Sequence, residues 1–156
     1  MTDSAKLPEI RGVFLPLQSG RLLLPNAAVS EVVDYHESKQ ESDDAPEWLM
    51  GMTKWRGESV PLISFDALVG SPTVEIESRA RIAICNTLNG NARIPFIAIL
   101  LTSMPYLIRV SEEVVIPLQE KADLGKVVAQ QVEINKEKAW IPDLDVLEKT
   151  VSQFIN

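Results

Sequence analysis

The side chains that could take part in nucleophilic or metal chemistry are few in this sequence. It holds one histidine, His36, and one cysteine, Cys85. A structural zinc site of the usual kind needs four cysteine or histidine ligands, so we expect no metal. A Ser-His-Asp triad would have to use His36, which opens an acidic segment where nothing evident fixes its tautomer. We therefore interpret His36 as a solvated loop residue, and Cys85 as a small apolar residue of a buried strand.

Two pairs of aspartates are the remaining candidates for catalysis. Asp43 and Asp44 are adjacent in the acidic segment, whereas Asp143 and Asp145 stand where a helix is expected to begin. Paired carboxylates can divide the general acid and base roles. Adjacent acids are also ordinary in a solvated loop, and acids at a helix start cap it and favour its dipole. We expect no catalytic residues and no cofactor; the enzyme alternative is a small hydrolase using His36 or an aspartate pair.

The segment 48–57 combines two tryptophans, two methionines and an arginine. Tryptophan and arginine are over-represented among the residues that dominate binding energy at interfaces, and methionine adapts to different partners. We predict that Trp48, Met50 and Met52 fill the core. Trp55 is flanked by charged residues, so both a core role and a partner-binding role stay open for it.

Arg56 and Gly57 come directly before an expected strand. A glycine there suits a turn with positive φ or a close backbone approach. An arginine that is even partly buried needs a carboxylate partner. Glu31 is the best candidate, because it lies in an apolar strand where an unpaired charge is costly. We predict a Glu31–Arg56 ion pair, and the two-residue period of a strand places Val29, Glu31 and Val33 on one face.

Short apolar runs separated by turn signals dominate the chain, which indicates barrels or a sandwich built from nine or ten strands. Eight of these strands are expected at 13–17, 21–24, 28–34, 59–64, 80–87, 93–101, 106–110 and 126–134. Pro61 inside a strand favours an edge position or a bulge. Asn89–Gly90 between two apolar runs predicts a hairpin turn.

Helices are expected only as one turn near 66–70, with Gly70 at its left-handed end, and as a terminal helix capped by Asp143. The stretches 62–68 and 141–147 share matching aspartates and leucines. Each is predicted to run from a strand into a short helix. Such an echo is what two similar subdomains would leave in the sequence.

Length and charge narrow the class of protein further. The 156 residues favour one compact domain, and 15 basic against 22 acidic residues give a net charge of −7. An acidic surface repels phosphates, so we expect neither nucleic acid nor anionic lipid as a partner. The longest apolar run, 94–101, is far shorter than the ~20 residues that a membrane helix needs. Residues 1–6 lack the features of a signal peptide, so we expect a cytoplasmic protein without membrane insertion.

The motif around Arg56 resembles that of the CheW-like domain. The family pattern has Leu-Pro, then Val-x-Glu-Val, a variable loop, and Gly-Val-x-Asn-Leu-Arg-Gly-x-x-Val-Pro-Val-Ile-Asp-Leu. Leu24-Pro25 and Val29-Ser30-Glu31-Val32 match its first part, and 51–65 match the rest in register. The resemblance covers about residues 12–70 well. Lys54-Trp55 replaces Asn-Leu, and Ser64 replaces the aspartate. With these departures the chain resembles the CheW-like proteins of type IV pilus (twitching) systems more than the flagellar protein.

The resemblance implies an all-β fold with short helices, in which two SH3-like five-stranded barrels pack together. It implies one domain over 12–156, made of two interleaved barrel subdomains, after a flexible N-terminus, 1–11. The implied function is a non-catalytic adaptor, recruited to receptor arrays, that binds the cytoplasmic tip of a chemoreceptor and the regulatory domain of a CheA-like histidine kinase.

The implied partner-binding residues are Val29, Glu31, Trp55, Arg56 and Gly57. Two alternatives stay open: a small-molecule-binding double barrel, and a CheW-like competitor that does not couple a kinase. A ligand-binding protein predicts a cavity between the barrels, whereas an adaptor predicts a packed apolar interface there.

Overall fold

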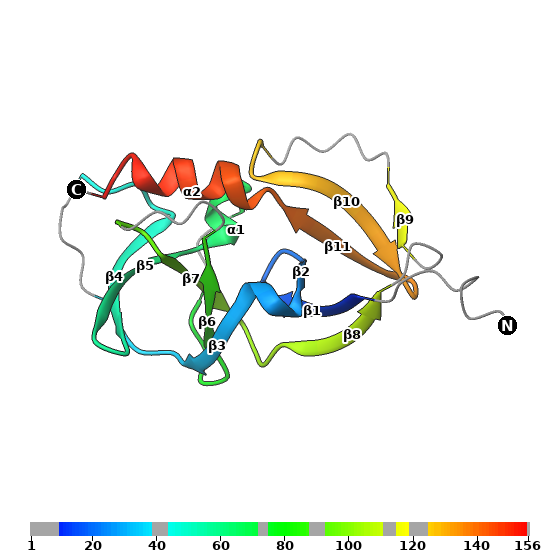
Figure 1. Cartoon of the computed structure of the whole chain (residues 1–156), viewed down its shortest axis with the longest axis horizontal. Helices are drawn as coiled ribbons and strands as arrows, with labels where there is room; N and C mark the ends of the chain where they lie inside the picture. Colours follow the sequence, from blue (N-terminus) through cyan, green and yellow to red (C-terminus); the bar gives the residue numbers. More distant parts are fainter. Residues whose placement is uncertain are drawn as a thin grey trace, which may run out of the picture.

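The computed structural model describes residues 10–38, 44–71, 75–87, 93–110, 115–118 and 125–155, whose strands form two sheets (Figure 1). The six-stranded sheet has the order β8-β1-β2-β11-β10-β9, with β1 Ile10–Pro16, β2 Arg21–Pro25, β8 Tyr106–Val110, β9 Val115–Pro117, β10 Val128–Ile134 and β11 Glu137–Pro142. The five-stranded sheet has the order β3-β6-β7-β5-β4, with β3 Val29–Asp34, β4 Leu49–Trp55, β5 Glu58–Ile63, β6 Arg81–Asn86 and β7 Phe96–Leu101. Two α-helices, α1 Phe65–Leu68 and α2 Leu144–Ser152, and the 3-10 turn η2 Asn26–Ala28 complete the described part.

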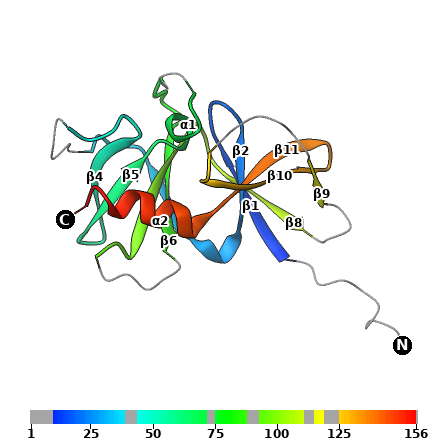
Figure 2. The same cartoon turned by 90° about the horizontal axis from the view of Figure 1, so that it is seen from above.

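The two sheets lie end to end along the long axis, and α2 leaves β11 and crosses onto the five-stranded half (Figure 2). The predicted mostly-β fold is confirmed. One sheet has six strands instead of five because the short β9 pairs with β10. Strand β1 begins at Ile10, two residues before the expected domain start, and the rest of the predicted flexible N-terminus lies outside the described residues. No helix in the described ranges is long and apolar enough to cross a membrane.

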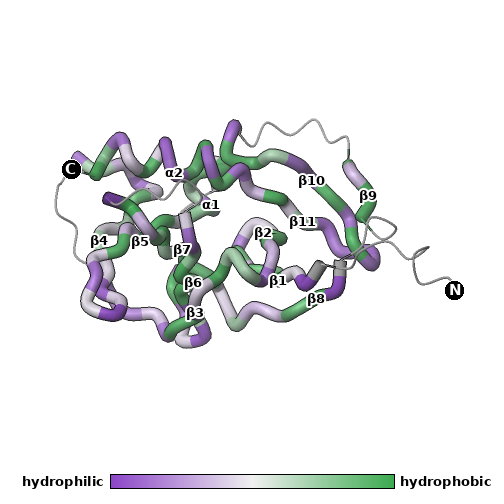
Figure 3. Tube along the Cα trace, viewed as in Figure 1, coloured by the Kyte–Doolittle hydropathy of each residue, from purple (hydrophilic) through white to green (hydrophobic). Residues whose placement is uncertain are grey.

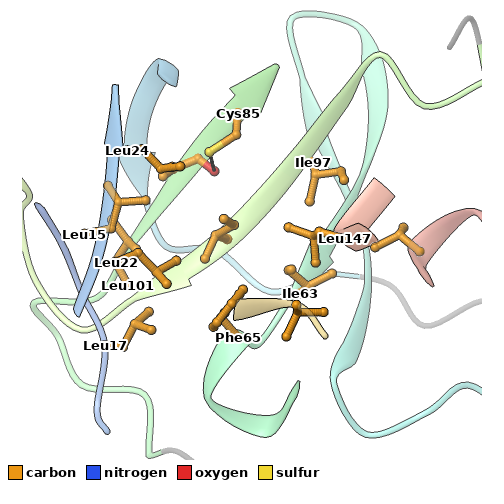
Figure 4. Close-up of a cluster of buried hydrophobic side chains, with 14 of the residues drawn as sticks. Leu15, Leu17, Leu22, Leu24, Ile63, Phe65, Cys85, Ile97, Leu101 and Leu147 are labelled. Atoms are coloured by element: carbon orange, nitrogen blue, oxygen red, sulfur yellow. Dashed lines mark hydrogen bonds between the residues drawn. The ribbon is translucent and has the colours of Figure 1, made fainter. Parts of the chain in front are cut away.

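Alternating side chains divide the buried residues into three clusters. One lies inside the curved six-stranded sheet and contains Phe14, Leu23 and Ile134. A second contains only residues of the five-stranded sheet, such as Leu62 and Ile84. The largest cluster fills the space between the sheets; Figure 4 shows its members from both sides. These labelled members are Leu15, Leu17, Leu22, Leu24, Ile63, Phe65, Cys85, Ile97, Leu101 and Leu147.

The predicted echo between 62–68 and 141–147 is visible in the structure. Ser64 caps α1 by accepting a hydrogen bond from the Ala67 backbone N–H, and Asp143 caps α2 in the same way from Val146. Serine and aspartate are both strong N-cap residues, so the two caps are equivalent although the residue types differ. Gly70 has the predicted positive φ, +84°.

A buried carboxylate ties the two halves together. Asp66 in α1 is 3% exposed and belongs to the five-stranded half. Its two oxygens accept hydrogen bonds from the backbone N–H groups of Gln18 and Ser19, at 3.0 and 2.8 Å, and from the Ser19 hydroxyl. Gln18 and Ser19 form the turn between β1 and β2, so α1 fixes an end of the six-stranded sheet.

The predicted edge position of Pro61 is wrong. Strand β5 lies between β4 and β7, but its pairing with β7 begins only at Leu62. Pro61 therefore sits before that ladder, where its missing N–H costs no hydrogen bond to β7. The irregularity is on the partner strand, between Leu49 and Gly51.

Candidate functional site

Glu31 on β3 is held by two side chains from the end of the β4 strand. The indole Nε1 of Trp55 donates a hydrogen bond to Glu31 Oε1 at 2.9 Å. The guanidinium Nε of Arg56 donates to the same oxygen at 3.1 Å, and Nη2 of Arg56 also lies 3.1 Å from it. The predicted Glu31–Arg56 ion pair is confirmed, and the bond from Trp55 adds a contact that the sequence did not reveal.

Aromatic packing fixes the indole of Trp55 in this cluster. The rings of Trp55 and Phe96 meet edge to face, with centroids 4.8 Å apart, and both pack on the cluster of the five-stranded sheet. On the other side, Cζ of Arg56 lies 5.2 Å from the Trp55 ring centroid. An exposed cation over an aromatic ring contributes about 0.5–1 kcal/mol. The Trp55 side chain therefore packs on the core and also orients Glu31 and Arg56, while its partner-binding role stays a prediction.

A tight turn presents Arg56 at the surface. Arg56 and Gly57 connect β4 to β5 and have φ angles of +48° and +78°, while Trp55 pairs with Glu58. Two central residues with positive φ define the hairpin turn called type I′. The predicted positive φ of Gly57 is confirmed, whereas its partner-binding role stays a prediction. The left-handed region costs an ordinary residue about 1–2 kcal/mol, and such conformations gather at functional sites.

The charges of the cluster remain open to solvent. The side chain of Arg56 is 72% exposed and that of Glu31 is 38% exposed. The hydrogen bonds from Trp55 and Arg56 hold the pKa of the Glu31 carboxyl below its ordinary value. An exposed ion pair contributes at most about 1 kcal/mol to stability. Its main effect here is to fix the orientation of a cation and a carboxylate that a partner can reach.

The cluster belongs to a side-chain seam between β3 and β4, the two outer strands of the five-stranded sheet. Three contacts form this seam: Glu31 with Trp55 and Arg56, the ring Nε2 of His36 with the hydroxyl of Thr53, and the hydroxyl of Ser38 with the carbonyl of Met50. The prediction that nothing holds the His36 ring is wrong, since Nε2 lies 2.5 Å from Thr53 Oγ1 and Nδ1 lies 3.3 Å from the Asp34 carbonyl. These contacts could not be predicted from the sequence, because they join residues from opposite edges of a curved sheet.

Val29 lies apart from the other predicted site residues. The pairing of β3 with β6 shifts between Val29 and Glu31, so one residue is bulged out of the regular alternation. As a result Val29 packs on the core between the sheets, whereas Val33 packs on the cluster of the five-stranded sheet. The prediction that Val29, Glu31 and Val33 share a face is therefore wrong, because a bulge reverses the side on which side chains point.

The candidate residues Asp143 and Asp145 have structural roles in α2. Asp143 caps α2, and Asp145 lies 3.1 Å from Lys149 in an ion pair within that helix. Asp43 lies outside the described residues, as does the predicted Asn89–Gly90 turn. Cys85 is 2% exposed, and burial raises the pKa of its thiol to about 12. Among the described residues, no group of three or more potential metal ligands is brought together.

The space between the sheets is packed with apolar side chains, which is the arrangement expected of an adaptor. A cleft of about 580 Å³ lies beside this core, lined by Leu17 and Gln18, by residues near Ile76, and by residues 100–103. Its lining includes charged side chains, Glu75, Glu77 and Arg79. It therefore differs from the central ligand cavity that a small-molecule-binding double barrel would need.

Phe96 is the member of the cluster that sequence reasoning missed. It begins β7 in an apolar run whose residues are otherwise buried, so nothing in the local pattern marked it. Its ring contact with Trp55 joins the start of β7 to the end of β4, two segments far apart in the sequence, so no local signal encodes it.

These features together define a class of protein: two packed β-barrels with an exposed, side-chain-organised cluster on one of them. The family model of the CheW-like domain matches residues 11–150, and the chain belongs to this family. The crystal structure of the scaffolding protein TtCheW from Thermoanaerobacter tengcongensis is similar, with a TM-score of 0.72 and 18% identity over 88% of this chain and 90% of that one. Comparison with curated proteins gives no match.

Proposed function

We propose that this protein is a non-catalytic scaffold of chemotaxis-type signalling, which couples a chemoreceptor tip to the regulatory domain of a CheA-like histidine kinase. The observation that carries this proposal is the Glu31–Trp55–Arg56 cluster, because it joins two residues that match the family pattern, Glu31 and Arg56, to Trp55 in one exposed site. Tryptophan and arginine residues that are held in place before binding lose little conformational freedom on docking. A scaffold role also fits the localisation expected here, which is the cytoplasmic side of receptor arrays.

Titration calorimetry against the regulatory domain of the CheA-like kinase from the same cell tests the proposal. We expect micromolar binding by the natural chain. Arg56→Ala and Glu31→Gln should each weaken it about tenfold, the effect of losing about 1.4 kcal/mol at an interface. Lys149→Ala is the matched control, since it removes an exposed cation from an ion pair of the same 3.1 Å length on α2.

The outcomes separate the two partners. Binding that is weakened by the variants at position 56 or 31, and unchanged in the Lys149 control, supports the kinase contact. If the folded protein gives no heat with the kinase domain, the same variants are titrated against the receptor tip. Absence of binding to both partners contradicts the scaffold proposal.

One contact favours the alternative that this protein competes with a coupling protein and does not itself couple a kinase. The indole of Trp55 already occupies Oε1 of Glu31, so a partner group that bonds to this oxygen must displace it. Kinase activity in receptor-containing membranes distinguishes the two roles. Added protein raises the receptor-stimulated activity if it couples the kinase, and lowers it in the presence of another coupling protein if it competes.

We also propose that the output is twitching motility driven by type IV pili. The support is the set of departures from the family pattern at Lys54, Trp55 and Ser64. Deletion of the gene should then reduce spreading on a surface and leave swimming unchanged. Loss of swimming with normal surface spreading would contradict this output.

A further inference from the structure

The β6–β7 hairpin closes beside two residues of the proposed binding site, Glu31 and Trp55. The last pair of this hairpin in the described residues is Asn86 opposite Phe96. Residues 82–85 of β6 are hydrophobic, and so is every residue of β7 (Figure 3). Asparagine is depleted in strands, so an asparagine at the end of this hydrophobic hairpin calls for a physical reason.

Phe96 supports the β4 side of the site through Trp55. The two rings meet edge to face, with centroids 4.8 Å apart, and both pack on the buried cluster of the five-stranded sheet. Such a contact restricts the plane of the indole, because aromatic pairs favour particular relative orientations. In this plane the indole Nε1 donates to Glu31 Oε1 at 2.9 Å, and the ring lies 5.2 Å from Cζ of Arg56. Loss of the Phe96 ring therefore frees the group that orients both charged residues.

Asn86 supports the β3 side of the site. Its Oδ1 accepts a hydrogen bond from the Ser30 hydroxyl at 2.7 Å, and its Nδ2 donates one to the Ala27 carbonyl at 3.3 Å. Ser30 is the residue bulged out of the pairing between β3 and β6, so its bond to Asn86 holds the bulge in place. In a strand without a bulge, Glu31 would lie on the side of Val29, which packs on the core between the sheets. The bulge therefore brings Glu31 to the side on which it meets the indole donor.

A different residue, Thr87, closes the hairpin itself. Its backbone N–H donates to the Pro95 carbonyl at 3.1 Å, and its hydroxyl donates to the Ile94 carbonyl at 2.7 Å. The two hydrogen bonds of the Asn86 side chain instead leave the hairpin and end on η2 and on the start of β3. The Asn86 amide therefore serves the neighbouring strand, and the hairpin has its own closing contacts.

On the basis of the function proposed above, we propose that Asn86 and Phe96 are positioning residues for the same binding site. Phe96 holds Trp55, and Asn86 holds the bulge that presents Glu31, so together they fix the arrangement that a partner meets. Both lie outside residues 12–70, where the family pattern is matched, so the pattern assigns them no role. A site that its neighbours hold in place loses little conformational freedom when a partner docks, so a loosened site should bind less tightly.

The pH titration of the Trp55 indole N–H resonance tests these roles without any partner, because its midpoint reports the pKa of the Glu31 carboxyl. Phe96→Leu and Asn86→Ala should each raise this midpoint toward the ordinary value of 4.5, since a loosened indole donor stabilises the carboxylate less. A role limited to stability would lower the urea midpoint of a variant and leave this titration unchanged.

Matched variants separate positioning from a general loss of packing. Phe96→Tyr keeps the ring and should keep the natural midpoint, whereas Ser30→Ala should reproduce the shift of Asn86→Ala. Phe154→Leu is the control, because it removes the ring that meets Trp48 edge to face at 5.5 Å, and it should leave the midpoint unchanged. Circular dichroism checks that each variant is folded, and Phe96→Met takes the place of Phe96→Leu if the latter does not fold.

Titration calorimetry against the regulatory domain of the CheA-like kinase then tests the effect on binding. Phe96→Leu and Asn86→Ala should each weaken binding about fivefold, as expected for residues that act through a neighbour, while Phe96→Tyr and Phe154→Leu should bind like the natural chain. A pH midpoint that stays at the natural value in a folded Phe96→Leu or Asn86→Ala variant overturns the positioning role of that residue. A shifted midpoint with unchanged binding overturns its role in partner recognition. If the natural chain binds no partner, the proposed function fails, and the indole titration alone decides whether the two residues position the site.

Discussion

Replacement of Asp66 is expected to weaken the joint between the two halves of the molecule. Asp66→Ala removes three hydrogen bonds to a carboxylate and leaves the backbone N–H groups of Gln18 and Ser19 without their acceptor. Hydrogen bonds to charged groups contribute about 1.5–3 kcal/mol each, and an unsatisfied buried donor costs about 1–3 kcal/mol. Water can reach part of this turn, so we expect a total loss of about 3 kcal/mol in the free energy of unfolding.

Urea denaturation measures this loss as a shift of the midpoint at constant slope. Asp66→Asn keeps one acceptor oxygen and the shape of the side chain, so about half of the effect should remain. Asp34→Asn is the matched control, because its carboxylate is 90% exposed and pairs with Arg81 at the surface. A free energy for Asp66→Ala within about 0.5 kcal/mol of the natural chain, the range of ordinary surface substitutions, would refute the structural role of this carboxylate.

Three further results are expected. The indole N–H resonance of Trp55 should titrate with a midpoint below 4.5, because the pKa of the Glu31 carboxyl is lowered from that value. The stability that this cluster contributes is present above the pKa of Glu31 in the unfolded chain and is lost as the pH falls through its pKa in the folded protein. A midpoint at or above 4.5 contradicts this prediction. Cys85 should react with a disulfide reagent at pH 8 only upon unfolding in urea, because burial raises its pKa to about 12; rapid labelling of the native protein contradicts its burial. Lys136→Gly should raise the free energy of unfolding by about 1 kcal/mol in thermal denaturation, because Lys136 has a φ of +70° in the β10–β11 turn, and an unchanged or lower value contradicts this strain.

Local chemistry allowed much of the fold to be predicted from the sequence. Apolar alternation located most strands, and the capping residues Ser64 and Asp143 stand where the two helices begin. The Glu31–Arg56 ion pair was predictable because a charge in an apolar strand requires a partner. These features depend on neighbouring residues or on one strong physical requirement.

The features that could not be predicted depend on how distant strands meet. The bulge at Ser30 turns the side chains of Val29 and Glu31 to different faces of the sheet, and no residue type in this segment predicts a bulge. Strand β5 is internal although it contains Pro61, because β4 pairs with its whole length whereas β7 pairs only with Leu62 and Ile63. The contacts of His36 and Phe96 arise from the curvature of the five-stranded sheet, which the sequence does not encode locally.

The order in which the chain visits the two sheets has a consequence for its synthesis. Strands β1 and β2 emerge first, yet their neighbours β8 and β11 come from the second half of the chain. Leu22 in β2 is opposite Trp140, so the chain as far as β11 must leave the ribosome before this pair can form. Folds dominated by such distant pairings form slowly. The side of β2 that β11 covers therefore stays exposed until β11 has been synthesised, and the nascent chain is expected to depend on chaperones more than the size of the domain would indicate.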